Sequence, residues 1–244
     1  MYFYTICFSL GDPKSNCYLY MLMMMVHTLT LTGTFKPLSD KFFVITDEAT
    51  GCVINKLSIL NNVEVVPVPR CKDVYEMMKW KYRLHNYIDL SGQDTLYLDV
   101  DMLGLKPLRF TLPEDTFLVA PEGQATDKNY CAAGPLRLPW GVSAGIFGYR
   151  FGPKVRQVFE HVLQRMEAEP ERYYTLDQPH FNTAFPHTKF LTVPAGGISF
   201  NGHGDLSKAF LMNLAGEPGD GPFHYLKMLE MYMRINYGAS GSRN

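Results

Sequence analysis

Two acidic residues one position apart, Asp99 and Asp101, lie at the end of the apolar, β-prone segment 94–103. A carboxylate inside a strand without water or a partner is costly, so we expect the pair at the carboxyl end of the strand. Ligands bind at that end of an α/β sheet. Two oxygen ligands at this spacing suit Mg²⁺ or Mn²⁺, which keep positions open for water or a diphosphate. The pattern predicts a divalent-cation site, and its competitor is a solvated acidic turn.

The elements that must position this pair alternate along the first half of the chain. Strands are expected at 2–8, 41–46, 63–68 and 95–100, and helices at 15–31, 52–60 and 74–87. This alternation predicts an α/β fold with a mixed, mostly parallel central sheet flanked by helices. Later in the chain, strands are expected at 116–120 and 145–149, helices at 154–168, 176–184 and 225–237, and loops over 195–222.

The composition predicts one domain over residues 1–237 and a flexible tail at 238–244, because no linker rich in Ser, Gly or Pro divides the 244 residues. A hydrophobic share of 46% supports a full core. The 23 basic and 24 acidic residues leave a net charge of −1, which gives no sign of a nucleic-acid-binding stripe. An anionic substrate must therefore be met by local charges.

Cysteine usage and hydropathy indicate a compartment. Five cysteines without C-x-x-C spacing favour reduced thiols over a disulfide framework or a zinc site. The apolar run 18–26 is about half of the roughly 20 residues needed to cross a bilayer, and the N-terminus lacks the features of a signal peptide. The expectation is a cytoplasmic protein with no transmembrane segment.

The segment 97–103 (YLDVDML), at the end of the fourth β-α repeat, resembles the metal-binding motif of GT-A fold, nucleotide-sugar-dependent glycosyltransferases, closest to family 8 and its relatives, including those of large viruses. Four more segments fit this resemblance: 3–6 (FYTI) as the first strand that cradles the base, 79–83 (KWKYR) as the basic helix before the metal motif, 141–147 (GVSAGIF) as the small-residue segment after it, and 176–182 (LDQPHFN) as the Asp-Gln segment near the acceptor.

The resemblance implies a metal-dependent transfer of a sugar from a nucleotide diphosphate sugar, with UDP as the nucleotide, to a hydroxyl acceptor such as a glycan. Mn²⁺ or Mg²⁺ is the implied cofactor. The donor-binding residues that it implies are Thr5 and Ile6 for the base, with Asp99, Val100, Asp101, Ser143, Ala144, Gly145, Gln178 and Gly216.

One departure concerns the third metal ligand. Members of the family usually present a late His in an H-F-x-G sequence, whereas this chain has Asn213-Leu-Ala-Gly216. An Asn carbonyl oxygen binds a divalent metal more weakly than imidazole or carboxylate does. His224 could take the place of the missing ligand if the Gly-rich loop folds back. Otherwise, His224 packs at the start of the last helix, and sequence spacing does not choose between the two.

Charge balance suggests phosphate-binding residues. A sugar diphosphate carries about two negative charges, which one divalent cation and Lys81 or Arg83 could neutralise as the leaving group departs. Lys227 could add a second contact. Lys79 and Arg83 are neighbours on a helix while Lys81 points elsewhere, so not all three can reach the site. An ordinary solvated basic face is the alternative.

Asp177 is the best remaining carboxylate for work on the acceptor side. It could deprotonate the attacking hydroxyl or steady the oxocarbenium-like charge, and both roles need it near the anomeric carbon. The alternative is an N-cap, because Asp177 precedes a short expected helix. It can serve both purposes only if its second oxygen stays free.

A rival interpretation is a serine hydrolase, because 141–145 (GVSAG) matches G-x-S-x-G. Ser143, Asp177 and His224 also follow the order nucleophile, acid and base. A nucleophile elbow needs a strand before the serine and a helix directly after it, yet prolines and Trp140 precede Ser143 and a strand-like segment follows. The hydrolase is the weaker reading.

The sequence also bears on two other classes of protein, a non-catalytic binding protein and a dehydrogenase. A nucleotide-sugar-binding protein without turnover would keep the fold, and Asn213 in place of His is its only hint. Hydrolysis of the donor would distinguish an active transferase from such a binding protein. A Rossmann dehydrogenase is disfavoured because the first β-α turn, 9–15, has no G-x-G-x-x-G to admit a pyrophosphate.

Overall fold

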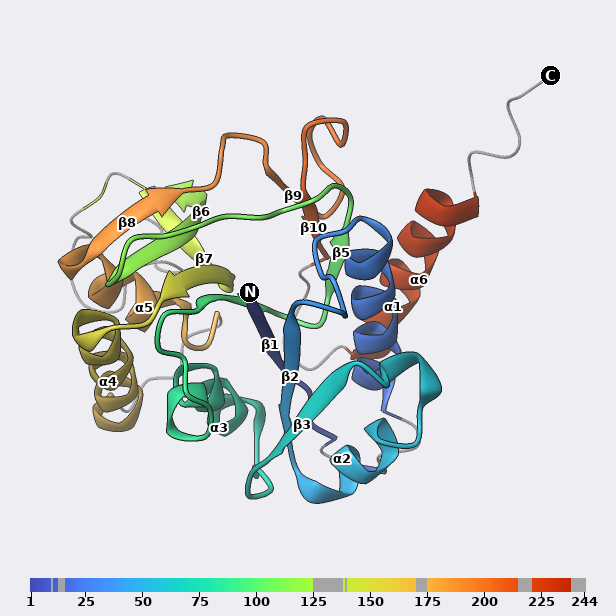
Figure 1. Cartoon of the computed structure of the whole chain (residues 1–244), viewed down its shortest axis with the longest axis horizontal. Coiled ribbons are helices and arrows are strands. Elements are labelled where there is room, and N and C mark those ends of the chain that lie inside the picture. The colour runs from blue at the N-terminus through green and yellow to red at the C-terminus, as the bar shows by residue number, and fades with distance from the viewer. Residues whose placement is uncertain are drawn as a thin grey trace.

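The computed structural model describes residues 1–9, 11–12, 16–124, 138, 140–169, 175–214 and 221–237. In this part of the chain, seven strands form one sheet (Figure 1). Their order is β3 (Val63–Pro67), β2 (Lys41–Thr46), β1 (Tyr2–Ile6), β4 (Asp94–Leu98), β7 (Trp140–Arg150), β6 (Thr116–Gln124) and β8 (Lys189–Thr192). A second sheet has the order β5 (Met102–Gly104), β10 (Leu211–Asn213) and β9 (Ile198–Phe200).

The main sheet is mixed and mostly parallel, as the sequence predicts. The pairs β3–β2, β2–β1, β1–β4 and β6–β8 are parallel, whereas β4–β7 and β7–β6 are antiparallel. Strand β4 therefore has a parallel neighbour, β1, on one side and an antiparallel neighbour, β7, on the other. Because β1 and β4 are adjacent and parallel, their carboxyl ends lie at the same edge of the sheet.

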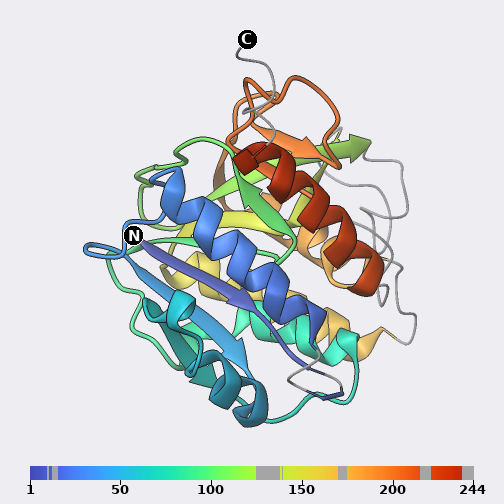
Figure 2. The same ribbon diagram turned by 90° about the vertical axis from the view of Figure 1, so that its right-hand side faces the viewer.

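Helices cover both faces of the sheet, and two hydrophobic clusters follow from the alternation of side chains along each strand. Leu96 and Leu98 of β4 join one cluster, while Tyr97 between them joins the other. The first cluster packs against α1 (Cys17–Leu31) and α6 (Gly221–Tyr237), which lie side by side (Figure 2). The second cluster packs against α4 (Pro153–Ala168) and α5 (Gln178–Ala184).

Asn and Asp side chains begin the early helices. Asn16 accepts from Tyr18 N at 3.1 Å at the start of α1, and Asp47 accepts from Thr50 N at 2.9 Å at the start of α2 (Glu48–Ile54). Such capping satisfies backbone N–H groups that have no partner within the helix. The helix predicted at 52–60 is therefore placed wrongly, because Asp47 starts it earlier and it ends at Ile54, followed by the 3₁₀ turn Ser58–Leu60.

The single helix predicted at 74–87 is also wrong. The structure has a short α3 (Val74–Met78), capped by Asp73, followed by the 3₁₀ turns Lys79–Tyr82 and Leu84–Asn86. A 3₁₀ turn has about three residues per turn rather than 3.6, so side chains rotate to positions that an α-helix would not give. The break buries Lys81 under the sheet edge instead of leaving it on a solvated face.

The loop predicted over 195–222 is wrong in part, because it contains β9 and β10, and α6 begins at Gly221. These strands have three residues each, too short for an alternating pattern to show. Pairing between the strands holds them in place: Asn213 pairs with Met102 of β5 and with Phe200 of β9. Pairing with β5 brings the segment after β10 to the aspartate pair.

A buried histidine in α5 predicts acid sensitivity of the fold. The His180 side chain is fully buried, with Tyr75 Oη 3.4 Å from Nε2, and burial lowers its pKa to about 4. Below the ordinary pKa of 6.5, the unfolded chain takes up a proton that the folded chain excludes until about pH 4. The stabilisation from neutral His180 is therefore complete above pH 6.5 and is lost as the pH falls toward 4.

We expect this one histidine to reduce the free energy of unfolding by about 1–2 kcal/mol between pH 7.5 and pH 5. Urea unfolding of wild type and His180→Gln at the two pH values measures it, since only the wild type carries this contribution. The exposed residue His203 provides the control variant His203→Gln. An equal loss of stability between the two pH values in wild type and His180→Gln would contradict the prediction.

Candidate functional site

A cavity of about 240 Å³ opens at the carboxyl ends of β1 and β4. The apolar part of its lining, here called the apolar wall, includes Ile6, Cys7 and Phe8 at and after the end of β1, together with Val74, Met77 and Met78 of α3. Residues Ser143, Ala144 and Gly145 of β7 also line it, with Thr175, Leu176, Asp177 and Gln178 at the start of α5. The charged part, here called the polar floor, includes Lys81, Asp99 and Asp101, and Val100, Asn213 and His224 line the cavity as well.

Asp99 and Asp101 leave the sheet where β4 ends, as predicted. The Asp99 backbone N donates to Gly145 O at 2.8 Å, which ties the end of β4 to β7. Gly145 must lack a side chain here, because a Cβ on it would lie 2.7 Å from Asp99 Oδ2 and 3.3 Å from Asn213 Nδ2. Oδ2 of Asp99 and the amide nitrogen of Asn213 therefore lie near the same point.

One oxygen of the Asp101 carboxylate, Oδ1, is buried and has no hydrogen-bond partner among the described residues. The pKa of Asp101 is raised to about 7. Burial is the larger cause, and the negative charge of Asp99 is the second. An unpaired buried carboxylate oxygen is costly, so this group calls for a cation.

Lys81 is the buried cation of the site. It is 2% exposed, and its Nζ lies 3.3 Å from Asp99 Oδ1 and 3.2 Å from Asp177 Oδ1. Its Nζ also donates to Ala144 O at 3.4 Å. Burial alone lowers the pKa of Lys81, but Asp177 and Asp99 outweigh it and raise the pKa above its ordinary value. The ammonium group stays charged and links the two carboxylates.

Asp177 has both oxygens occupied. Oδ1 accepts from Lys81 Nζ, and Oδ2 accepts from Tyr82 Oη at 2.5 Å. Its side chain makes no capping bond to α5, so the N-cap alternative is wrong. Burial raises the pKa of Asp177, although Lys81 and Tyr82 act in the opposite direction. Leu176 before it has φ of 55°, a conformation that L residues rarely adopt, which turns the backbone into α5.

Gln178 and Asn182 join α5 to β7. Gln178 Oε1 accepts from Ala144 N at 2.9 Å, and Asn182 Oδ1 accepts from Val142 N at 2.7 Å while its Nδ2 donates to Val142 O at 2.8 Å. These bonds use side-chain amides in place of a neighbouring strand. They fix the start of α5, and with it Asp177, relative to the cavity wall.

The donor set fits a divalent cation. When all three are ionised, Asp99, Asp101 and Asp177 carry three negative charges against the one positive charge of Lys81, which a dication would balance. Among the described residues, no three His, Cys, Asp or Glu side chains are grouped so that they could hold a metal ion, so His224 does not join the aspartates. Of the predicted oxygen ligands, the carboxylates of Asp99 and Asp101 line the cavity together with Asn213, whose Nδ2 is the amide atom on the side of Gly145.

Several other predicted residues lie elsewhere. Arg83 does not line the cavity, because its guanidinium lies over Trp80 and 3.4 Å from Glu167 Oε1. The break in the predicted helix turns it away from the site. Thr5 is buried within β1, so only Ile6 of that predicted pair reaches the cavity.

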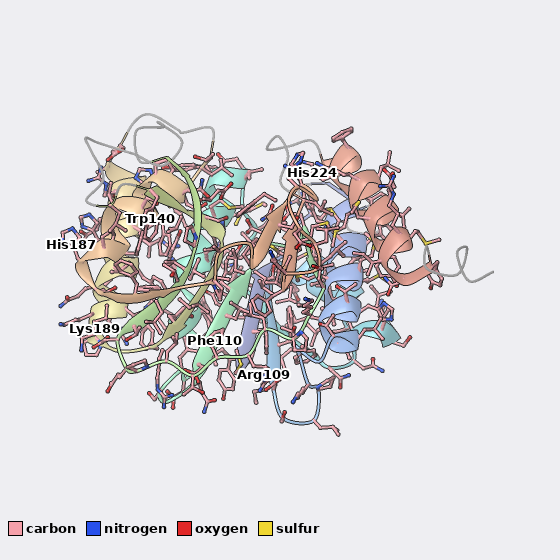
Figure 3. All side chains as sticks on the ribbon, turned by 90° about the horizontal axis from the view of Figure 1, so that it is seen from above. Arg109, Phe110, Trp140, His187, Lys189 and His224 are labelled. Carbon is pink, nitrogen blue, oxygen red and sulfur yellow. The ribbon has the colours of Figure 1, made fainter. Side chains whose placement is uncertain are left out.

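Three further predicted residues, Lys227, Gly216 and His224, belong to the C-terminal part of the chain. Lys227 donates to Asn201 Oδ1 at 2.6 Å, and its charge acts to lower the pKa of Asp101. It therefore lies near the aspartates without lining the cavity. Gly216 falls outside the described residues. Figure 3 places His224 at the start of α6, in the half of the molecule with α1, whereas Trp140 lies in the half with α5.

The sequence interpretation missed the apolar wall and the tyrosines beneath the site. Met77, Met78 and Phe8 line the cavity, but a run of apolar residues predicts core and gives no sign of a ligand. Glu122, near the end of β6, also lines it and carried no motif. Tyr82 was read only as a residue between Lys81 and Arg83.

The serine-hydrolase alternative lacks its required context. Ser143 lies inside β7, an eleven-residue strand, rather than at a turn from strand to helix. Its Oγ accepts from Gly145 N at 3.3 Å. A hydrolase triad also needs its acid to hold the histidine base, whereas the Asp177 oxygens accept from Lys81 and Tyr82.

The sheet order and the position of the cavity define a GT-A-like α/β fold, the fold of nucleotide-sugar glycosyltransferases. A crystal structure of the galactosyltransferase LgtC, in complex with donor and acceptor sugar analogs, superposes with a TM-score of 0.60 at 13% identity, over 94% of this chain and 96% of that one. An active-site mutant of LgtC gives a TM-score of 0.62 at 12% identity, over 95% and 96%.

A third match is the apo form of mouse xyloside xylosyltransferase 1, with a TM-score of 0.57 at 11% identity, over 87% of this chain and 96% of that one. No family model matches this chain, and no curated protein matches it either. At these identities the likeness establishes the fold. Across the ranges that the structure describes, no helix combines the length and the apolar character that a membrane crossing requires.

Proposed function

We propose that this chain is a metal-dependent glycosyltransferase that moves a hexose or pentose from a UDP-sugar to a hydroxyl group of a glycan. The observation that carries the proposal is the cluster of Asp99, Asp101, Asp177 and Lys81 around one cavity, at the ligand-binding edge of a GT-A-like sheet. The matches to solved galactosyl- and xylosyltransferases support it. The unpaired Asp101 oxygen supports the cation.

Asp99, Asp101 and the Asn213 amide would hold Mn²⁺ or Mg²⁺. When bound, the cation would supply positive charge to the diphosphate and so favour its departure. Lys81 would contribute a second, fixed positive charge, already oriented by two carboxylates. Asp177 would hold Lys81 in place and present negative charge toward the sugar, where an oxocarbenium-like charge develops.

The apolar wall offers a surface for the flat base of the nucleotide. Ile6 ends β1, Phe8 lies two residues further on, and Met77 and Met78 of α3 line the same cavity. A base stacks on apolar and sulfur-containing side chains without needing a charge partner. The polar floor and the apolar wall together suit a ligand with an apolar ring at one end and a diphosphate at the other.

Titration of UDP into the protein with and without Mn²⁺ tests the proposal. We expect metal-dependent binding in wild type and none detectable in Asp99→Asn/Asp101→Asn, because the double variant removes both carboxylate ligands without changing side-chain volume. Asp89→Asn is the matched control, since Asp89 is exposed and does not line the cavity. Equal binding with and without Mn²⁺, or none in wild type, would overturn the metal-dependent donor site.

Turnover separates transfer from mere binding. Incubation with a panel of UDP-hexoses and UDP-pentoses, with release of UDP as the readout, should show metal-dependent hydrolysis or transfer for one of them. UDP binding without any release of UDP across the panel would instead favour the non-catalytic nucleotide-sugar-binding protein.

A further inference from the structure

Four fully buried tyrosines, Tyr4, Tyr82, Tyr97 and Tyr149, form a layer beneath the candidate site. Phe147 lies among them: its ring is stacked on Tyr82 at 6.0 Å and on Tyr97 at 5.0 Å between centroids. Rings packed in this way cannot swing to new rotamers without opening the core. Their hydroxyl groups are therefore fixed in space by packing that has nothing to do with a ligand.

Two of these hydroxyls reach the carboxylates of the site. Tyr97 Oη donates to Asp99 Oδ1, and Tyr82 Oη donates to Asp177 Oδ2 at 2.5 Å. The Lys81 ammonium lies 5.1 Å from the centre of the Tyr97 ring, within reach of its π face. A third hydroxyl supports the same segment, because Tyr4 Oη donates to the backbone oxygen of Lys81 at 2.7 Å.

Each tyrosine hydroxyl occupies one oxygen of its carboxylate, so the other oxygen is the one that can bind a second group. On Asp99, Oδ1 is taken by Tyr97 and Lys81, whereas Oδ2 lies on the side of Gly145 and the Asn213 amide nitrogen. On Asp177, Oδ2 is taken by Tyr82, which leaves Oδ1 for Lys81. Hydrogen bonds to a ligating carboxylate fix its orientation and set its affinity for the metal.

We propose that Tyr97 and Tyr82 are positioning residues, which act through Asp99 and Asp177 respectively; this role rests on the function proposed above. Tyr97 aims Asp99 Oδ2 at the cation position. Tyr82 holds Asp177 so that Lys81 keeps its place between the two carboxylates. The two halves of the site, metal side and sugar side, are thereby aligned by one rigid aromatic layer.

Three single-hydroxyl variants test this assignment: Tyr97→Phe, Tyr82→Phe and the control Tyr149→Phe. The control removes a hydroxyl from the same layer, and no described carboxylate accepts a hydrogen bond from it. Binding of Mn²⁺ alone is measured by electron paramagnetic resonance titration. The carboxyl resonances of Asp99 and Asp177 are followed by ¹³C NMR of protein labelled at aspartate, and thermal unfolding is recorded for each variant.

We expect Tyr97→Phe to weaken Mn²⁺ binding about tenfold and to move the Asp99 resonance. Tyr82→Phe should move the Asp177 resonance and change Mn²⁺ affinity less than about twofold, since it acts on the other carboxylate. Tyr149→Phe should change neither. A merely structural role would lower the unfolding temperature of Tyr97→Phe and Tyr82→Phe and leave Mn²⁺ affinity at wild-type values in the folded protein, which would overturn the proposal.

Two safeguards keep the test decisive. If Tyr97→Phe does not fold, 3-fluorotyrosine at position 97 keeps the ring and the hydroxyl but alters its strength as a donor, and unchanged Mn²⁺ affinity with an unchanged Asp99 resonance would count against the assignment. A wild-type protein that binds no Mn²⁺ contradicts the metal-dependent function itself. The carboxyl spectra still decide the tyrosine contacts in that case, and resonances that do not move in their paired variants overturn them.

Discussion

Replacing Lys81 with methionine is expected to lower the free energy of unfolding by about 3–5 kcal/mol, because it leaves Asp99 and Asp177 buried without their shared cation. Methionine keeps the length and most of the apolar stem, so the loss comes from charge rather than from a cavity. We also expect sugar transfer to fall by about 10²–10³-fold, since a fixed positive charge near a leaving diphosphate is lost. Urea unfolding and UDP release measure the two effects.

The control and the double variant separate these effects. Lys79→Met removes a neighbouring ammonium that lies 3.9 Å from Glu167 and outside the cavity, and it should change stability by less than about 1 kcal/mol. Lys81→Met/Asp177→Asn removes both partners of the buried pair and should recover part of the lost stability but none of the activity. A Lys81→Met protein with near-wild-type stability and turnover would refute the central place of this lysine.

Asp177→Asn is the second change with a large expected effect. Asparagine has the same shape, but it carries no charge to hold Lys81 or to face a developing positive charge on the sugar. We expect kcat for UDP release to fall by about 10²–10⁴-fold, with little change in the affinity for Mn²⁺, whose proposed ligands are Asp99 and Asp101. Steady-state kinetics beside Mn²⁺ titration separates these two quantities.

Asp94→Asn is the matched control, because Asp94 lies at the other end of β4, pairs with Arg150 at 3.5 Å and accepts from Leu112 N at 3.0 Å. It should cost some stability and leave kcat within a few-fold. If Asp177→Asn keeps the wild-type kcat, Asp177 is only a structural partner of Lys81. If Mn²⁺ binding is lost together with kcat, the division into a metal side and a sugar side is wrong.

The α/β class and the position of the aspartate pair could be predicted because they depend on local patterns. The alternation of helices and strands is visible in apolar periodicity, and charged residues after an apolar strand can only lie at its end. The GT-A-like architecture came from the resemblance, and the solved structures confirm the fold. The direction of Lys81 was not accessible, because it depends on a 3₁₀ break that the basic segment 79–83 does not reveal.

The rest of the site depends on contacts between distant segments. Nothing near Tyr82 in the sequence predicts its hydrogen bond to Asp177, which directly precedes α5 and lies 95 positions later in the chain. Asn213 was found as a departure from a family pattern, but its approach to Asp99 follows from the pairing of β10 with β5. Three-residue strands carry too little periodicity for that pairing to be predicted.

The same pairing has a consequence for how the protein is made. Leu214 N donates to Asp101 O at 3.0 Å, and Met102 pairs with Asn213, so the proposed cation site is complete only when residues roughly 110 positions apart meet. During synthesis, the aspartates leave the ribosome well before β10 does. We expect the nascent chain to form the parallel sheet first, with an acidic edge that stays open, and to gain its affinity for metal only in the last stage of folding.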